Sequence, residues 1–259
     1  MRTIAITAFA LLSGAACADT GWVRLAASNS TAESKAAADF VCTGTNDELT
    51  VQKAVDVCKG DGRHLMLAAG LYVLGSVRDF GDGGPRAAVC IRNMHREFAF
   101  VGERRQLAGW PDDMRVNGVV LYLAPEALKG ADGKSVDILR GEWSGQGIMN
   151  GSALRMENVA VYAPDSQHPL RAVDLQRVNS AELHNVQLRA FGTAILNGLK
   201  YPYGNPPAPA VDNIGITLTD GSNNIPVELF NINSIGFGQC FQVGGEHVVM
   251  INCSATFGP

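Results

Sequence analysis

Five segments in the second half of the chain repeat one pattern, in which an asparagine interrupts an alternation of apolar and polar residues. Apolar residues at every second position indicate strands with one buried face. At each asparagine the phase breaks, because the flanking apolar positions, such as Met156 and Val159, are three residues apart. A strand must bend there, and asparagine suits a bend because it tolerates left-handed backbone angles. The five residues are Asn158, Asn185, Asn213, Asn231 and Asn252.

These asparagines lie 27, 28, 18 and 21 residues apart. A strand–bend–strand unit that recurs in this way is typical of a solenoid, here a parallel β-helix, in which each coil stacks on the last at about 4.8 Å. We therefore predict an all-β fold in which the five asparagines form a ladder, with each side-chain amide bonded to its neighbours. The step from Asn213 to Asn231 is short for a full coil.

A helix is predicted ahead of the first coils, from Asp47 to Cys58. Asn46 or Asp47 can cap its N-terminus, and its apolar face is formed by Val51, Ala54, Val55 and Cys58. The open end of a β-helix exposes unpaired strand edges and core side chains. We expect this amphipathic helix to be an N-terminal cap that covers the first coil.

The first eighteen residues have the pattern of a secretory signal peptide. Arg2 precedes an apolar run from Ile4 to Leu12, and small residues end in Ala16-Cys17-Ala18. The run is too short for a permanent membrane span. We predict a signal peptide over residues 1–18, a lead-in over 19–37 and a β-helix domain over 38–259. The protein would then be secreted or periplasmic, and lipid anchoring at Cys17 is the alternative.

Export permits disulfide bonds. Five cysteines follow the predicted cleavage site, so at least one thiol stays free. Cys42 and Cys58 flank the compact segment that contains the helix and form the best candidate pair. Cys253 occupies an inward position of the asparagine repeat and is expected to behave as a small buried apolar residue.

The composition and the motifs exclude several classes of function. The net charge is −4, which argues against nucleic acid as a partner. The sequence contains no G-x-S-x-G, no zinc-type Cys/His spacing, no phosphate-binding loop and no acidic calcium loop. We therefore expect no metal and no cofactor.

One stretch makes a family resemblance visible. The sequence ADFVCTGTNDELTVQKAVDVCKGDGRHLMLAAGLYVL, residues 38–74, resembles the opening of the pectate-lyase-like right-handed parallel β-helix proteins. These include secreted polysaccharide lyases and hydrolases, bacterial surface proteins and phage tail proteins. The resemblance implies a right-handed coil and a protein that acts on polysaccharide. The chain lacks both the paired aspartates with Gly-His-Gly of the galacturonan hydrolases and the arginine-rich signature of the classical pectate lyases.

A first candidate site follows from the predicted register, which stacks the outward residues of the repeat in two columns. One column contains Glu157, His184 and Asp212, and its neighbour contains Arg155 and Glu182. Carboxylates on adjacent coils would lie about 5 Å apart, and those two coils apart about 10 Å, near the separations that glycosidases use. The histidine could act as acid or base. The alternative is an ordinary water-facing sheet with alternating charges.

The resemblance points to a second candidate site. Related enzymes place their groove on the sheet two strands away from the asparagine corner, where Asp174 lies in the predicted strand Arg171–Gln176. By that resemblance Asp174 would be catalytic, and a saccharide would contact residues of the strand and of the loops 163–169 and 199–207. These residues are His168, Arg171, Tyr201 and Tyr203. The alternative is that the loops only pack on the flank of the solenoid.

Two hypotheses of function remain open. The first is a secreted lyase or glycoside hydrolase that acts on polysaccharide, and the second is a non-catalytic glycan-binding, adhesin-like or tail-like β-helix. The chain stops at a corner, without a segment that could cover the last coil. We therefore expect either a fragment or a coil covered by a partner, with self-association through the open C-terminal coil.

Overall fold

The computed structural model describes most of the chain after the predicted signal peptide. The residues it describes are 21–81, 83–92, 97–106, 114–131, 133–142, 153–163, 168–178, 180–190, 192–196, 199–203, 212–218, 227–244 and 247–256. Residues 1–20, with the predicted signal peptide and Cys17, lie outside this part. Within it, no helix combines the length and the apolar character needed to cross a membrane.

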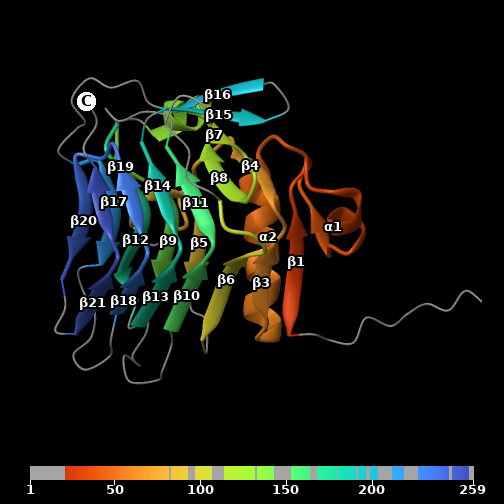
Figure 1. Ribbon diagram of the computed structural model, residues 1–259, viewed down its shortest axis with the longest axis horizontal. Coiled ribbons are helices and arrows are strands. Elements are labelled where there is room, and N and C mark those ends of the chain that lie inside the picture. The colour runs from red at the N-terminus through yellow and green to blue at the C-terminus, as the bar shows by residue number, and fades with distance from the viewer. Residues whose placement is uncertain are drawn as a thin grey trace, which may run out of the picture.

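Three sheets of parallel strands make up the body of the molecule (Figure 1). Sheet A consists of β2 (Phe40–Val41), β1 (Trp22–Ala26), β3 (His64–Leu67), β6 (Phe98–Gly102), β10 (Ala153–Glu157), β13 (Ser180–His184), β18 (Val227–Phe230) and β21 (Val248–Ile251). Sheet B consists of β4 (Gly70–Leu74), β8 (Val119–Leu123), β11 (Val159–Tyr162), β14 (Gln187–Arg189), β19 (Asn233–Ile235) and β22 (Ser254–Thr256). Sheet C consists of β5 (Arg86–Arg92), β9 (Val136–Glu142), β12 (Leu170–Arg177), β17 (Ile214–Leu218) and β20 (Gln239–Val243).

The chain visits the sheets in a fixed order. It passes from A to B to C in the coil β3–β4–β5 and repeats this order down to β18–β19–β20, and every strand pairs with its counterpart in the next coil. The inward side chains of the three sheets form one continuous apolar core, with Leu65, Leu121 and Val173 as examples from each sheet. The chain is therefore all-β with stacked parallel sheets, an architecture consistent with a β-helix solenoid.

The predicted asparagine ladder is confirmed for four of the five residues. Asn158, Asn185, Asn231 and Asn252 all have left-handed backbone angles, with φ between 54° and 58°. The Nδ2 atom of each later residue donates to the Oδ1 atom of the one before it, over 3.0 Å to Asn158, 2.6 Å to Asn185 and 3.0 Å to Asn231. The bend between sheets A and B is thus repeated and cross-linked from coil to coil.

The prediction for Asn213 is wrong. This residue directly precedes β17 of sheet C, and its Nδ2 atom donates to the backbone oxygen of His168 over 3.2 Å. The ladder therefore passes directly from Asn185 to Asn231, across 46 residues. The alternation around Asn213 is that of a strand, but the strand belongs to another sheet, and an insertion between β14 and β17 makes one long coil look like two short ones.

That insertion contributes to a small fourth sheet, seen above the coils in Figure 1. Its strands β15 (Gly192–Leu196) and β16 (Leu199–Tyr203) form an antiparallel hairpin. The strand β15 also pairs in parallel with β7 (Met114–Arg115), which lies in an insertion of an earlier coil. The first residues of the predicted 199–207 loop are therefore a strand, while residues 204–207 lie outside the described part.

The N-terminal end carries two helices, α1 (Ala32–Ala36) and α2 (Asp47–Asp61), and a 3-10 helix (Pro125–Ala131) follows β8. All four predicted apolar-face residues of α2 are buried. Asn46 has left-handed angles and makes no side-chain cap. The Asp47 carboxylate instead accepts hydrogen bonds from the backbone N–H groups of Thr43, Gly44 and Val73. Strand β1 of sheet A lies within the segment predicted as a lead-in.

The predicted pair of Cys42 and Cys58 is not formed. Among the described residues Cys42, Cys58, Cys90, Cys240 and Cys253 are all free thiols. Cys42 and Cys58 are buried in the core next to α2, and this burial raises the pKa of Cys58 to about 12 and that of Cys42 further. They pack as small apolar residues, which is the role that the sequence had suggested for Cys253. Cys253 itself is only partly buried.

The asparagine ladder leads to a prediction about stability at Asn185. Asn185→Ala is expected to lower the free energy of unfolding by about 2–3 kcal/mol, because alanine disfavours left-handed angles and two side-chain hydrogen bonds are lost. Asn185→Gly keeps the backbone angle accessible and should cost less, about 1–2 kcal/mol. Urea unfolding of the two variants measures the difference. Equal losses for alanine and glycine would show that the backbone angle contributes nothing.

Candidate functional site

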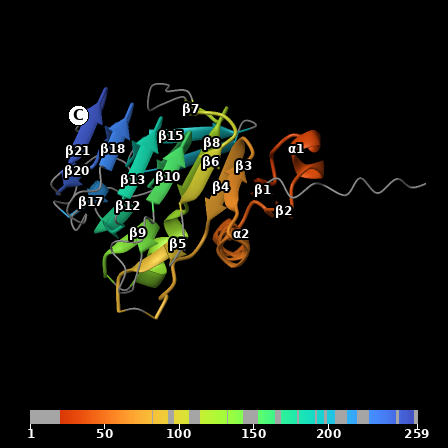
Figure 2. The same cartoon turned by 90° about the horizontal axis from the view of Figure 1, so that it is seen from below.

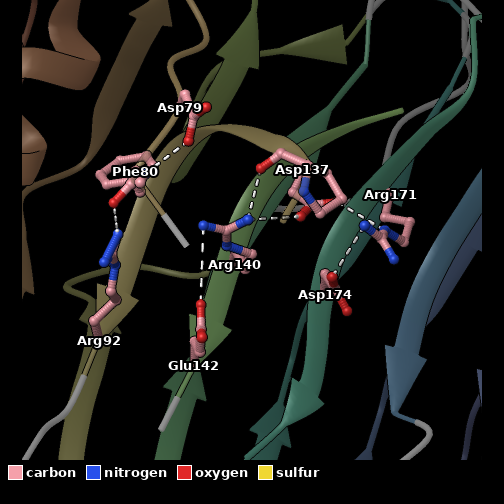
Figure 3. A network of polar contacts seen from close by, with 10 residues as sticks. Asp79, Phe80, Arg92, Asp137, Arg140, Glu142, Arg171 and Asp174 are labelled. Carbon is pink, nitrogen blue, oxygen red and sulfur yellow. Dashed lines mark hydrogen bonds and ion pairs between the residues drawn. The ribbon is translucent and has the colours of Figure 1, made fainter. Parts of the chain in front are cut away.

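The outer face of sheet C carries a cluster of five charged side chains, which we call the sheet C network. Asp137, Arg140 and Glu142 come from β9, and Arg171 and Asp174 come from the neighbouring strand β12. The register places Arg171 beside Asp137 and Asp174 beside Arg140. Figure 3 shows the guanidinium groups lying between the carboxylates.

Arg171 connects the two aspartates. Its Nε atom donates to Asp137 Oδ1 over 2.7 Å, and its Nη2 atom lies 3.3 Å from Asp174 Oδ2. Arg140 extends the cluster, with Nη1 4.0 Å from Asp137 Oδ2 and Nη2 3.9 Å from Glu142 Oε2. The Arg171–Asp137 contact is the shortest of these, and it joins two coils of the solenoid through side chains.

The network is almost wholly buried. Asp137 is 0 % exposed, Arg140 and Asp174 are each 4 % and Glu142 is 5 %. Holding three carboxylates together in a low-dielectric environment is unfavourable, and a proton on one of them lowers this cost.

Asp137 is the group that takes this proton. Burial raises the pKa of the Asp137 carboxyl to about 7, and the neighbouring Asp174 carboxylate raises it as well, against the opposing effect of Arg171 and Arg140. Asp137 is therefore protonated below neutral pH. Two carboxyl groups in one cluster, one of which titrates near pH 7, are an arrangement suited to proton transfer.

The segment before β5 packs on one end of the network through Phe80. Arg140 Nη1 donates to the backbone oxygen of Pro85 over 2.6 Å, and Arg140 Cζ lies 5.8 Å from the centre of the Phe80 ring. Arg92 donates from Nη2 to the backbone oxygen of Phe80 (Figure 3). Arg140 thus belongs both to the network and to the contact that holds this segment in place.

The residues predicted for the second site are only partly brought together. Arg171 and Asp174 both lie in the network. The His168 ring contacts the backbone oxygen of Lys134 through Nε2 at 3.2 Å. Tyr201 and Tyr203 belong to β16 of the small fourth sheet, and their side chains lie outside the described part.

Asp212 does not lie with the other residues of the predicted first site on sheet A. The register confirms that Arg155 lies beside Glu182 and that Glu157 lies beside His184. It continues the two columns with Glu228 and Phe230. Asp212 precedes β17 in sheet C, because Asn213 is not a ladder residue. The next neighbour of His184 is therefore Phe230, with ring centres 5.8 Å apart in an edge-on arrangement.

Among the described residues of this face, Arg155 and Glu157 form an ion pair, with Arg155 Nη2 2.6 Å from Glu157 Oε2. The two side chains are 42 % and 23 % exposed. Water screens such a pair, so it contributes little to stability. Unlike the sheet C network, this face resembles a water-facing sheet.

Sequence reasoning missed Asp137, Arg140 and Glu142. A usable signal was present, because Asp137 lies between the apolar residues Val136 and Ile138, an alternation that is typical of a strand. Pairing that strand with Arg171–Gln176 would have placed Asp137 on the outer face. Because insertions of different length separate the strands, the sequence does not show which strands pair in adjacent coils.

Comparison of the chain with models of protein families, with curated proteins and with solved structures gives no match. Within the described residues, no group of three or more His, Cys, Asp and Glu side chains is placed to hold a metal ion. The candidate site is therefore defined by its own geometry.

Proposed function

We propose that the protein is an exported glycan-active enzyme, a glycoside hydrolase or lyase, whose reacting groups are Asp137 and Asp174. The observation that supports this is the pairing of two carboxyl groups on stacked strands through one shared guanidinium. Extended sheet faces of solenoids offer a binding surface for a linear polymer. The position of the network on sheet C agrees with the groove that the family resemblance implies.

In the hydrolytic form of the reaction, the protonated Asp137 carboxyl donates its proton to the glycosidic oxygen as the bond to the anomeric carbon breaks. The Asp174 carboxylate accepts a proton from the water whose oxygen attacks that carbon. Arg171 lies between the two groups and positions both of them. Because the network is buried, a substrate reaches it only when its cover, including the segment at Phe80, moves away.

The experiment is an assay of polysaccharides, neutral and acidic, for release of reducing ends by hydrolysis or unsaturated ends by elimination. We expect release by the parent chain and a rate of release lower by about a hundredfold or more in Asp174→Asn. Glu228→Gln, an exposed carboxylate on sheet A, is the matched control and should keep activity. Loss of release in His184→Ala instead, with Asp174→Asn active, would move the site to sheet A.

A non-catalytic glycan-binding or surface-attachment protein is the second candidate, and the burial of the network favours it. Buried charges of 0–5 % exposure are also typical of a structural clamp that holds adjacent coils together. Polysaccharide binding without release of ends, unchanged in Asp174→Asn and Asp137→Asn, would support this function.

We also infer the finer features of the fold. The coils are right-handed, as are nearly all parallel strand crossovers, and the chain is a distant member of the pectate-lyase-like group. The helix α2 serves as the N-terminal cap, because it packs on β1 and β3 of sheet A, β4 of sheet B and β5 of sheet C. Figure 2 shows it at the end of the stack opposite β21.

The last described coil leads to a prediction of self-association. Strand β21 pairs with β18 on one side only within the described residues, and Val249, Met250 and Ile251 are 44–53 % exposed. An unpaired edge with apolar side chains is a template for another strand. We propose that chains 1–259 associate through this edge, so that size-exclusion chromatography gives a concentration-dependent mass. A monomer at high concentration, with β21 amides as protected from hydrogen exchange as those of β11, would contradict it.

A further inference from the structure

A polar cavity beside the sheet C network lies between the helix α2 and the strand β5. Its volume is about 430 Å³. Lys59 and Asp56 of α2 form one wall, and Arg78, Asp79 and Phe80 of the preceding segment form another, with Arg92 of β5 beside them. The proposed function assigns no role to this cavity.

Positive charge is concentrated in this cavity. The Arg78 and Arg92 guanidiniums lie on the same aromatic ring, with Cζ 4.7 Å and 5.3 Å from the centre of Phe80. Lys59 adds a third cation. Holding like charges together costs free energy, and a bound anion lowers this cost.

The two acidic residues of the wall already have protein partners. Asp56 Oδ1 accepts a hydrogen bond from Gln52 Nε2 over 3.0 Å, and Asp79 Oδ1 accepts one from the backbone of Gly81 over 2.7 Å. With three cations and these two carboxylates, the formal charge of the lining is 3 − 2 = +1. Arg78 Nε is buried and has no hydrogen-bond partner among the described residues. A buried donor of this kind points to water or an ion that would complete it.

We propose that this cavity binds an oxyanion group carried by a sugar-sized polar molecule. Arginine side chains bind phosphate, sulfate and carboxylate groups through paired N–H donors, and lysine adds a compact charge. A volume of about 430 Å³ falls within the range of small-molecule sites and exceeds what a single oxyanion needs, so the remainder of the ligand has room beside the anionic group.

The test is isothermal titration calorimetry on the full chain at about pH 7 and constant ionic strength. Inorganic phosphate, glucose 6-phosphate and glucose are the three titrants. We expect one saturable site for glucose 6-phosphate, weaker binding of phosphate and none of glucose. Phosphate that binds as tightly as glucose 6-phosphate would overturn the sugar-sized ligand, since the oxyanion alone would then account for the binding.

Three variants locate the site. Arg78→Met and Lys59→Met each remove one charge from the cavity and should weaken binding of glucose 6-phosphate by roughly tenfold or more. Lys129→Met removes the same charge from the exposed part of the 3-10 helix and should leave binding unchanged. If Arg78→Met does not fold, Lys59→Met, on the surface of α2, carries the test. Absence of saturable anion binding, or equal weakening by Lys129→Met, would overturn the proposal.

Discussion

Replacing Arg171 by methionine is expected to lower the free energy of unfolding by about 3–5 kcal/mol near pH 8. Arg171 is the shared partner of Asp137 and Asp174, both of which are buried. Its removal leaves the two carboxylates without their shared cation, and an uncompensated buried charge is strongly destabilising. Urea unfolding followed by circular dichroism measures the loss.

The loss should be smaller near pH 5. The pKa of Asp137 in the folded protein is about 7, raised from 3.8, so at pH 5 this carboxyl is already protonated. A raised carboxyl pKa favours the folded state most below the unfolded pKa, and this contribution is lost as the pH rises through about 7. The parent chain should therefore lose stability relative to Asp137→Asn between about pH 4 and pH 8.

Arg155→Met provides the matched control. It removes the same charge and a contact of 2.6 Å, but its side chain is 42 % exposed. We expect a cost of only about 0–1 kcal/mol, without a comparable pH dependence. Equal costs at Arg155 and Arg171 would contradict the assignment of a buried, charge-dependent network on sheet C.

Replacing either aspartate of the network is expected to reduce the rate of glycan cleavage by about 10²–10⁴-fold, the range that a positioned acid or base contributes. Asp137→Asn removes the proton donor, and Asp174→Asn removes the carboxylate that accepts a proton from water. Both substitutions keep the shape of the side chain. The rate of end release at saturating substrate measures the effect.

The pH profile of the parent enzyme provides a second readout. Activity that needs protonated Asp137 should fall as the pH rises through about 7, the pKa of that carboxyl in the folded protein. Substrate binding should survive in both variants, because the binding surface extends beyond the two carboxyls. Variants that retain cleavage with an unchanged pH profile would assign the network a purely structural role.

The sequence predicted the repeating part of this fold well. The phase break at each ladder asparagine is a local signal, since a three-residue spacing and a left-handed residue occur together at Asn158, Asn185, Asn231 and Asn252. The helix face at Val51, Ala54, Val55 and Cys58 was equally local, because it depends only on helical periodicity.

The errors came from non-local pairing. Asn213 follows the same alternation as the ladder residues but begins a strand of sheet C, and only the pairing of β17 with β12 reveals this. Only some residues of the sheet C network were predicted from the sequence, for a similar reason. Arg171 and Asp174 lie in one predicted strand, whereas Asp137 lies 34 residues before Arg171 in the sequence. Alternation gives the face of a residue but not its neighbour in the adjacent coil.

The small fourth sheet changes how the solenoid should lose its structure. Coils that touch only their nearest neighbours behave as a one-dimensional chain, in which opening at an end can spread one coil at a time. The strand β7 belongs to the coil of β6, β8 and β9, while β15 belongs to the coil of β13, β14 and β17. Their pairing passes over the intervening coil, β10–β11–β12, so that coil cannot open without breaking contacts between its two neighbours. We therefore expect these three coils to unfold as one cooperative unit, with stepwise fraying confined to the coils on either side of it.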